Sequence, residues 1–402
     1  RNGGCGAASF FVLIYFVLLF TLIGVSSFLQ KSPTVDEPVH LAAGYSYLKW
    51  GDFRANPEHP PLAKLWAALP LLAFDISDPR PSRPHWDSIT ENSEPVVTVD
   101  FARDLLFVDN NGETLFFYAK LQMIALAALL GALIYAWGKK LFGFEAGIAA
   151  LALFAFDPNI LGHSQIVHTD MPFALLFFLS VCCFWRLSEQ ANWRNLLLTS
   201  LFFGLAAVTK YSYVAILLAW FALGLVKVFS REPLISAFTN SRAIHSRLGK
   251  TILLSGGLTS ALAAAYFIIW AAYRFRFYAI DGGLRPLHME WVMPAENSLL
   301  HSLANFVYEH HLFPEAWIYG QLYVLKFLNR TAYLLGEISP DGFWSYFPVA
   351  FMVKTPLPTL MLLGVSLWMV VRGRISRTSG LFLFTPAAVY FLSAVWARKK
   401  LG

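Results

Sequence analysis

The chain has few charged residues and few cysteines, and each scarcity excludes a class of protein. Charged residues make up 14% of the 402 residues, well below the roughly 25% of an average soluble domain. The three cysteines, Cys5, Cys182 and Cys183, lie in or beside apolar stretches, which is typical of small buried side chains. The composition therefore excludes an ordinary soluble domain, and the cysteines indicate no disulfide or metal framework.

Apolar side chains dominate instead. Hydrophobic residues make up 57% of the chain and include 36 Phe and 13 Trp. This composition predicts an integral membrane protein. The formal net charge of +6 would suggest a nucleic-acid partner in a soluble chain. Here the basic residues gather beside the apolar runs, as in the cytoplasmic loops of membrane proteins, so no nucleic-acid partner is predicted.

Nine apolar runs are interpreted as membrane spans. They cover residues 10–29, 121–137, 142–156, 171–185, 195–209, 211–226, 251–273, 346–371 and 378–397. Several are shorter than the about 20 residues that a span needs, which predicts tilted helices or spans that include flanking polar residues. Pro356 and Pro358 predict a kink or a late start in the eighth run. The sequence thus predicts an all-α polytopic membrane protein of about nine transmembrane helices, in one domain over residues 1–402 that is truncated at both ends.

The distribution of Lys and Arg predicts which loops face outwards. With a cytoplasmic N-terminus, most basic residues of the short loops fall on the inner side, as the positive-inside rule requires. Two large loops, residues 30–118 and 274–345, and the turn 157–170 then lie outside. Lys210 falls on the outer side against the rule, which makes it a candidate contact for a lipid phosphate. The alternative is a side chain that snorkels to the interface.

An acidic pair, Asp36-Glu37, comes shortly after the first apolar run. Holding a carboxylate near lipid costs free energy, so such a pair is more often functional than structural. We interpret it as the acid/base group of an enzyme at a membrane surface. Capping is the alternative, because Thr34 and Glu37 have capping-box spacing and Asp36 could be the N-cap of the following helix.

That following helix is predicted over residues 38–50, in the membrane interface. Val39, Ala43, Tyr47 and Trp50 would share one stripe. Tyr and Trp are suited to the level of the lipid headgroups.

A rigid loop comes next, in which Glu58 and His59 precede two prolines. Proline fixes its own φ and restricts the residue before it, so this loop can hold both side chains in one geometry. We predict that both bind substrate. The alternative is that the pair only pins the loop.

The outer turn between the third and fourth runs ends at Asp170. This aspartate is a candidate catalytic residue, and the alternative is a plain helix start. Asp157, His163 and His168 lie in the same turn, where polar side chains either take part in function or only hydrate the end of a span.

Taken in order, these stretches resemble the membrane glycosyltransferases that use polyprenyl-phosphate sugars. The matching stretches are Asp36-Glu37, Gly51-Asp52-Phe53 leading to His59-Pro60-Pro61-Leu62, His168-Thr169-Asp170, residues 204–210 (GLAAVTK) and residues 344–349 (WSYFPV). This superfamily includes the dolichyl-phosphate-mannose protein mannosyltransferases and the bacterial aminoarabinose transferases. The resemblance implies the GT-C fold, a helical transmembrane bundle with two large extracytoplasmic loops that carry interfacial helices.

The resemblance also implies roles for individual residues. Asp36 takes the place of the family's catalytic base, and Asp170 that of an acidic residue associated with the active site. His59 stands before the two prolines, where the aminoarabinose branch has a lysine that contacts the lipid phosphate. The residues predicted as catalytic are Asp36, Glu37 and Asp170, and those predicted as substrate-binding are Glu58, His59 and Lys210.

The implied donor is a sugar joined through C1 to a polyprenyl phosphate, and the implied acceptor is a hydroxyl on a protein, a lipid or a polysaccharide. A carboxylate can take the hydroxyl proton as its oxygen attacks C1, and direct attack inverts the configuration. The departing phosphate needs a cation in a poorly screened site. No cofactor is predicted. A divalent metal could bind Asp36-Glu37 but is not required, since the mannosyltransferase-like members are treated as metal-independent.

We expect the active site on the outer face of a bacterial inner membrane, in contact with membrane lipid. A transporter with ion-binding carboxylates is one alternative. It predicts internal repeats in matched halves, and the sequence contains no convincing repeat. A non-catalytic membrane scaffold is the other alternative, and the presence of Asp36 and Asp170 argues against it.

Overall fold

A computed structural model of the chain describes residues 2–81, 86, 95–239, 242–280, 282, 286–327 and 331–396. Regular structure in these residues is almost entirely helical, with strands in two small sheets. The predicted all-α polytopic fold is thus confirmed. The chain forms two compact units, one of Arg1–Leu175 with Tyr278–Trp291 and the other of Leu176–Phe277 with Val292–Gly402.

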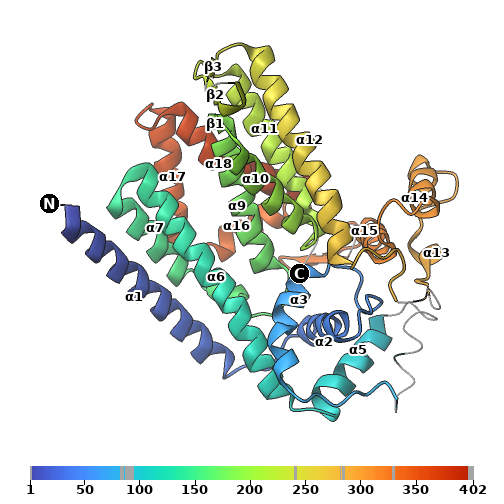
Figure 1. Ribbon diagram of the computed structural model, residues 1–402. Helices are drawn as coiled ribbons and strands as arrows, with labels where there is room; N and C mark the ends of the chain where they lie inside the picture. The colour runs from blue at the N-terminus through green and yellow to red at the C-terminus, as the bar shows by residue number, and fades with distance from the viewer. Residues whose placement is uncertain are drawn as a thin grey trace. The chain divides into compact units, whose positions relative to one another are not determined.

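Three long helices lie side by side in the first unit: α1 (Asn2–Phe28), α6 (Gly112–Phe142) and α7 (Phe144–Phe156) (Figure 1). A single residue, Gly143, joins α6 to α7. Its φ of +94° lies in the left-handed region, which glycine adopts without strain, so the two helices form a tight hairpin. After a bend of 63°, α8 (Pro158–Ser164) packs beside α1 and α6.

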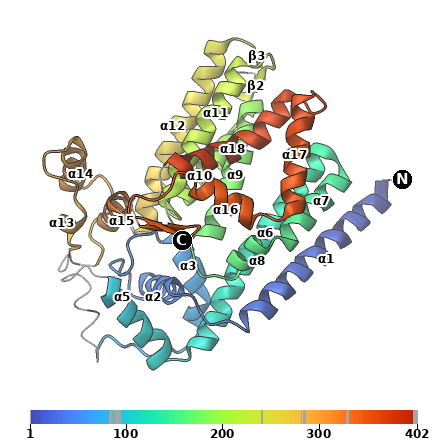
Figure 2. The ribbon, with the colours of Figure 1, turned by 180° about the vertical axis from the view of Figure 1, so that it is seen from behind.

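Short helices of the first large loop form a folded layer in the same unit (Figure 2). They are α2 (Asp36–Lys49), α3 (Leu62–Ala68), η1 (Leu69–Ala73), α5 (Pro95–Arg103) and the π-helical turn η2 (Asp104–Val108). Their core also includes residues of α6 and the turn after α8. Its members include Leu41, Ala42, Tyr45, Ala67, Leu71, Phe101, Leu105, Phe116, Met123 and Val167.

The prediction that one stripe of the helix over residues 38–50 faces the membrane interface is wrong. α2 is buried on nearly all sides, and Tyr47, which was expected at the headgroup level, is 2% exposed. Trp50 packs against Trp86 and Phe101 rather than facing lipid headgroups. The pattern of one helix does not show that later segments of the same loop fold over its outer side.

α2 and α3 approach each other closely at Gly44. A Cβ added to this residue would lie 2.2 Å from the carbonyl oxygen of Lys64, a separation that no side chain can adopt. The crossing therefore requires glycine. It fixes α2, which carries His40, against α3, which follows the loop of His59.

The second unit contains most of α9 and seven further helical elements of its apolar part. These are α9 (Asp170–Glu189), α10 (Trp193–Ala207), η3 (Tyr211–Tyr213), α11 (Val214–Phe229), α12 (Arg247–Ala272), α16 (Tyr346–Lys354), α17 (Leu357–Val371) and α18 (Arg377–Trp396). α10 packs along α12, and α11 packs on both α12 and α18. Cys182 and Cys183 are buried in α9, as predicted, whereas the side chain of Cys5 lies outside the described residues.

Smaller elements fill the remaining loops. They are η4 (Ala237–Thr239), α13 (Met289–Val292), α14 (Leu299–Glu309), α15 (Glu315–Lys326) and the antiparallel hairpin of β4 (Ala332–Leu334) and β5 (Glu337–Ser339). In the second unit, β2 (Leu234–Ser236) pairs parallel to β1 (Gln190–Ala191) and antiparallel to β3 (Arg242–Ile244), with Ile235 opposite Gln190 and Ala243.

Six helices in the described part of the chain are long and apolar enough to cross a membrane, and two bent pairs raise the number to at most eight. The predicted count of nine is not confirmed. The difference is α10, whose 15 residues extend about 22 Å, less than the about 30 Å of a bilayer core. The kink predicted from Pro356 and Pro358 is confirmed, because α16 and α17 meet at 111°.

Candidate active site

The acidic pair opens α2, but its two carboxylates have opposite environments. Asp36 is exposed and has no hydrogen-bond or ion-pair partner among the residues that the structure describes. Glu37 is 1% exposed. Its Oε1 accepts a hydrogen bond from the backbone N–H of Thr34 at 2.8 Å, the residue that the capping-box spacing pairs with it. The N-cap position is Val35, so the alternative that Asp36 is the N-cap is wrong.

The second oxygen of Glu37 joins two further segments to α2. Oε2 accepts a hydrogen bond from the N–H of Val167 at 3.0 Å and lies 3.4 Å from the Nζ of Lys120. Lys120 is a buried residue of α6. The Glu37 carboxylate therefore connects α2 to α6 and to the turn that precedes α9. This position suits a residue that holds the site together, while its predicted catalytic role stays a prediction.

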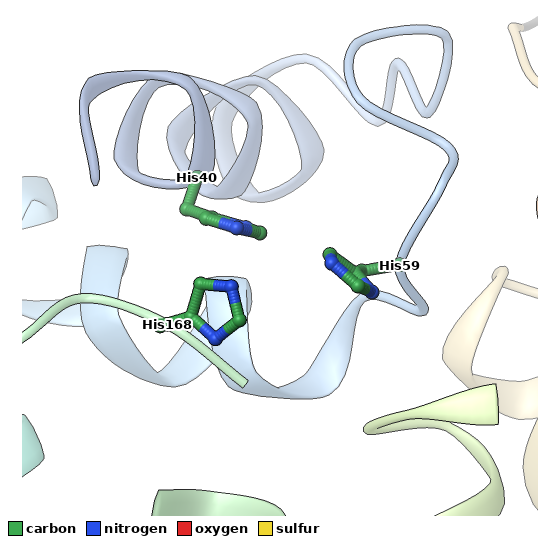
Figure 3. Close-up of side chains that lie close together, drawn as sticks. All are labelled: His40, His59 and His168. Atoms are coloured by element: carbon green, nitrogen blue, oxygen red, sulfur yellow. The ribbon is translucent and has the colours of Figure 1, made fainter. Parts of the chain in front are cut away.

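Three imidazoles gather next to this pair: His40 of α2, His59 of the loop before α3 and His168 of the turn before α9 (Figure 3). The ring centroids of His40 and His168 are 4.9 Å apart, those of His40 and His59 5.4 Å, and those of His59 and His168 5.6 Å. One ring nitrogen of each lies within 4.8 Å of the other two. These three side chains are named the histidine cluster.

His40 is the most buried member of the histidine cluster. It is 2% exposed and lies one helical turn after Asp36, so both residues project from the same side of α2. Within the described part of the chain, its Nδ1 has no hydrogen-bond partner. Burial lowers the pKa of His40 well below its usual value, and the neighbouring His59 and His168 lower it further. The ring is therefore neutral at physiological pH.

His59 is positioned by its loop and by Lys64 of α3. The Lys64 ammonium is buried, and it donates hydrogen bonds to the carbonyl of Asn56 and, over 3.0 Å, to the hydroxyl of Tyr47. Burial lowers the pKa of Lys64 to about 7, although the nearby Glu58 acts in the opposite direction. Lys64 thus anchors the loop of His59 to α2 and is not accessible to substrate.

Two carboxylates stand behind the imidazoles. Asp170, the first residue of α9, places its Oδ2 3.2 Å from the Nδ1 of His168 and 4.0 Å from the Nδ1 of His163. The Oε1 of Glu58 lies 3.9 Å from the Nε2 of His59. The structure therefore brings three of the predicted site residues, Glu58, His59 and Asp170, into one connected group through His168.

Lys210 belongs to the second unit. It lies directly before η3 and adopts an extended backbone conformation, with φ of −154°. Its predicted contact with a lipid phosphate stays a prediction.

A polar cavity adjoins the Glu37 side of the site. Its volume is about 310 Å³, and Glu37, Lys120, Lys31, Asn159 and His163 are among the residues that line it. A second cavity, of about 550 Å³, has a more apolar wall of Phe, Leu and Pro side chains but shares Lys31 and Lys120 with the first. Lys31 and Lys120 therefore lie at the border between the polar cavity and the more apolar one.

Three residues of this region were missed in the sequence: His40, Lys64 and Lys120. His40 had a signal, because its spacing of four from Asp36 puts both on one side of a helix. Lys120 also had a signal in the sequence, because it is a basic residue next to an apolar run. No local pattern distinguishes Lys64 from an ordinary surface lysine, since its burial depends on the crossing at Gly44.

Comparison with known families gives one match. Residues 110–270 match the model of the family described as dolichyl-phosphate-mannose-protein mannosyltransferase. Neither the curated proteins nor the solved structures give a match. The matched segment contains His168, Asp170 and Lys210 but not α2 or the loop of His59. The match confirms the resemblance found in the sequence and supports a membrane glycosyltransferase of the GT-C type.

Proposed function

We propose that this protein transfers a sugar from a polyprenyl-phosphate donor to a hydroxyl acceptor, with Asp36 as the general base. The observation that carries this proposal is the contrast within the acidic pair. Glu37 has three partners and is buried, whereas Asp36 is exposed and has none among the described residues. Of the two carboxylates in this pair, only that of Asp36 has both oxygens without a partner among the described residues and open to a substrate.

The reaction requires little more than this carboxylate and a cation. Asp36 takes the proton of the acceptor hydroxyl as the hydroxyl oxygen bonds to C1 of the sugar. The bond between C1 and the phosphate oxygen breaks at the same time, and the phosphate keeps the electron pair. Attack from the opposite side inverts C1. The phosphate is a good leaving group, so no second acid is needed.

We further propose that the donor phosphate binds near Lys31 and Lys120. Both lysines line the two cavities, and the wall of the larger one includes Phe28, Phe116 and Phe117, which suits the first isoprene units of the lipid. Positive charge in a poorly screened site stabilises a departing phosphate. Glu58, His59 and Lys210 are kept as the other substrate-binding residues predicted from the sequence.

The outer face of a bacterial inner membrane is the proposed location of this chemistry. Phe28 contacts Phe117, and Tyr135 binds the backbone of Ser9, so α1 and α6 run in opposite directions. The loop between them, which carries α2, therefore lies at one end of the pair. The excess of basic residues in the opposite loops favours the outer side for this end.

The test is transfer of labelled sugar from a panel of mannosyl, glucosyl and aminoarabinosyl polyprenyl phosphates to a cell-envelope extract. Asp36→Asn removes the base with little change in volume, so we expect a rate lower by about 10²–10⁴-fold and an unchanged unfolding temperature. Asp75→Asn, at another exposed carboxylate of the first unit, is the control and should keep the wild-type rate. Wild-type transfer by Asp36→Asn would exclude this base. Loss of folding together with activity would assign Asp36 a structural role instead.

A further inference from the structure

The histidine cluster has the composition and position of a metal centre. We propose that His40, His59 and His168 together bind one divalent ion of a first-row transition metal, of the zinc class, and leave one coordination position open. The assignment depends on these three side chains and does not depend on the proposed function.

The distances are close to those of a bound ion. Zinc bonds to imidazole nitrogen over about 2.0–2.1 Å in tetrahedral geometry, which separates the ligand nitrogens by about 3.4 Å. The three nitrogens here lie within 4.8 Å of one another. Each nitrogen therefore needs to move inwards by about 1 Å at most, which small rotations of the rings allow.

The buried polar atoms of the cluster favour a ligand. The Nδ1 of His40 is buried without a hydrogen-bond partner among the described residues, which has a cost in stability. A bound ion would remove that cost.

Carboxylates behind the rings give further support. Metal-bound histidines usually donate their other ring N–H to a carboxylate or a carbonyl, which fixes the tautomer. The Oδ2 of Asp170 lies 3.2 Å from the Nδ1 of His168; the two atoms make no hydrogen bond in the present geometry, but a small rotation of the ring would form one and leave Nε2 for the ion. The Oε1 of Glu58 lies 3.9 Å from the Nε2 of His59.

The ligand set also limits the kind of ion. Three imidazoles suit Zn²⁺, Co²⁺, Ni²⁺ or Cu²⁺, whereas Mg²⁺ and Ca²⁺ prefer oxygen ligands. A site with three protein ligands keeps a fourth position for water or substrate, unlike a closed structural site. If the proposed function holds, this position would offer positive charge to an anionic oxygen of the donor, one helical turn from Asp36.

The experiment measures metal binding without turnover. The purified full chain is stripped with a chelator and titrated with Co²⁺, followed by visible absorption, and the zinc content of the untreated protein is measured by mass spectrometry. We expect about one ion per chain and the intense bands of tetrahedral Co²⁺. His40→Ala should weaken binding at least tenfold. His168→Gln, at a residue that is 23% exposed, repeats the test at a position whose substitution disturbs the core less.

Two further variants sharpen the test. Asp170→Asn should weaken the affinity by about 10–100-fold through His168. His163→Ala is the matched control, because His163 also faces Asp170 but is 57% exposed and outside the cluster, and it should bind like the wild type. The absence of a bound ion in the wild type, or equal affinity in His40→Ala, His168→Gln and His163→Ala, overturns the proposal. Asp36→Asn should keep full metal binding, so failure of the metal site and failure of the proposed base give different results.

Discussion

Two buried polar side chains, one in each unit of the molecule, are satisfied by the protein to different degrees. In the second unit, the buried ammonium of Lys250 donates hydrogen bonds to the carbonyls of Lys227, Ser230 and Glu232 over 3.3, 2.9 and 2.6 Å. In the first unit, the Nδ1 of His40 has no such partner among the described residues. A buried group whose partners are all supplied by the protein stabilises the fold. A buried group that lacks them requires an explanation, such as a bound ion or water.

The same difference between satisfied and unsatisfied polar groups occurs within the candidate active site. Glu37 resembles Lys250, because every oxygen of its carboxylate has a partner in the chain. Asp36 and the Nδ1 of His40, on the same side of α2, lack such partners within the described residues. We therefore expect a structural role for Glu37 and Lys250 and a chemical role for Asp36 and the histidine cluster, and substitutions can test each expectation.

Glu37→Gln should have the largest effect on stability. The amide keeps the volume but leaves the buried Lys120 without its counter-charge, and its NH₂ group faces the N–H of Thr34 or Val167. Breaking a buried pair in this way costs about 3–5 kcal/mol, which is measurable as a lower midpoint of denaturant unfolding. Asp36→Asn, the same change at the exposed neighbour, is the control. If Glu37→Gln folds as stably as Asp36→Asn, the structural assignment of Glu37 is wrong.

Lys250→Met should have a smaller effect, confined to stability. Methionine fills a similar volume, but three carbonyls near β2 each lose one donor, and only those of Lys227 and Glu232 keep a hydrogen bond from the Ser230 hydroxyl. We expect a loss of about 1–3 kcal/mol. Lys140→Met, at an exposed lysine at the end of α6, should leave the unfolding midpoint unchanged. Transfer activity per folded molecule is expected to stay at the wild-type level, and a specific loss of activity would contradict the comparison.

Glu189→Gln should have the smallest effect. Glu189 is 44% exposed, although it lies 2.8 Å from the buried Nζ of Lys227. Solvent screens such a pair, so we expect a loss of about 0.2–1 kcal/mol. The loss should shrink further as salt is raised. An effect as large as that of Glu37→Gln would show that exposure does not separate the two carboxylates.

The broad fold could be predicted from the sequence because hydrophobicity and proline act locally. Each apolar run became a helix, and the break between α16 and α17 followed from Pro356 and Pro358. The length of α10 could not be predicted, since an apolar run does not show where its hydrogen bonds end. The burial of α2 also could not be predicted, because it depends on segments that are distant in the sequence.

The candidate site was predicted only in part for the same reason. Asp36, Glu58, His59 and Asp170 belong to short recognisable stretches. The histidine cluster joins residues from three separate stretches, and no spacing rule for metal ligands covers such distances. His40 in particular gave only the weak signal of its spacing from Asp36.

The spacing of the cluster along the chain has a mechanical consequence. His40 and His168 are about 130 residues apart in the sequence, so an ion held between them would act as a reversible cross-link and close a long loop that contains α6 and α7. In the chain-entropy model, closing a loop of this length reduces the freedom of the unfolded chain by an amount worth several kcal/mol. A chelator would then lower the unfolding temperature of the whole first unit as well as emptying the site.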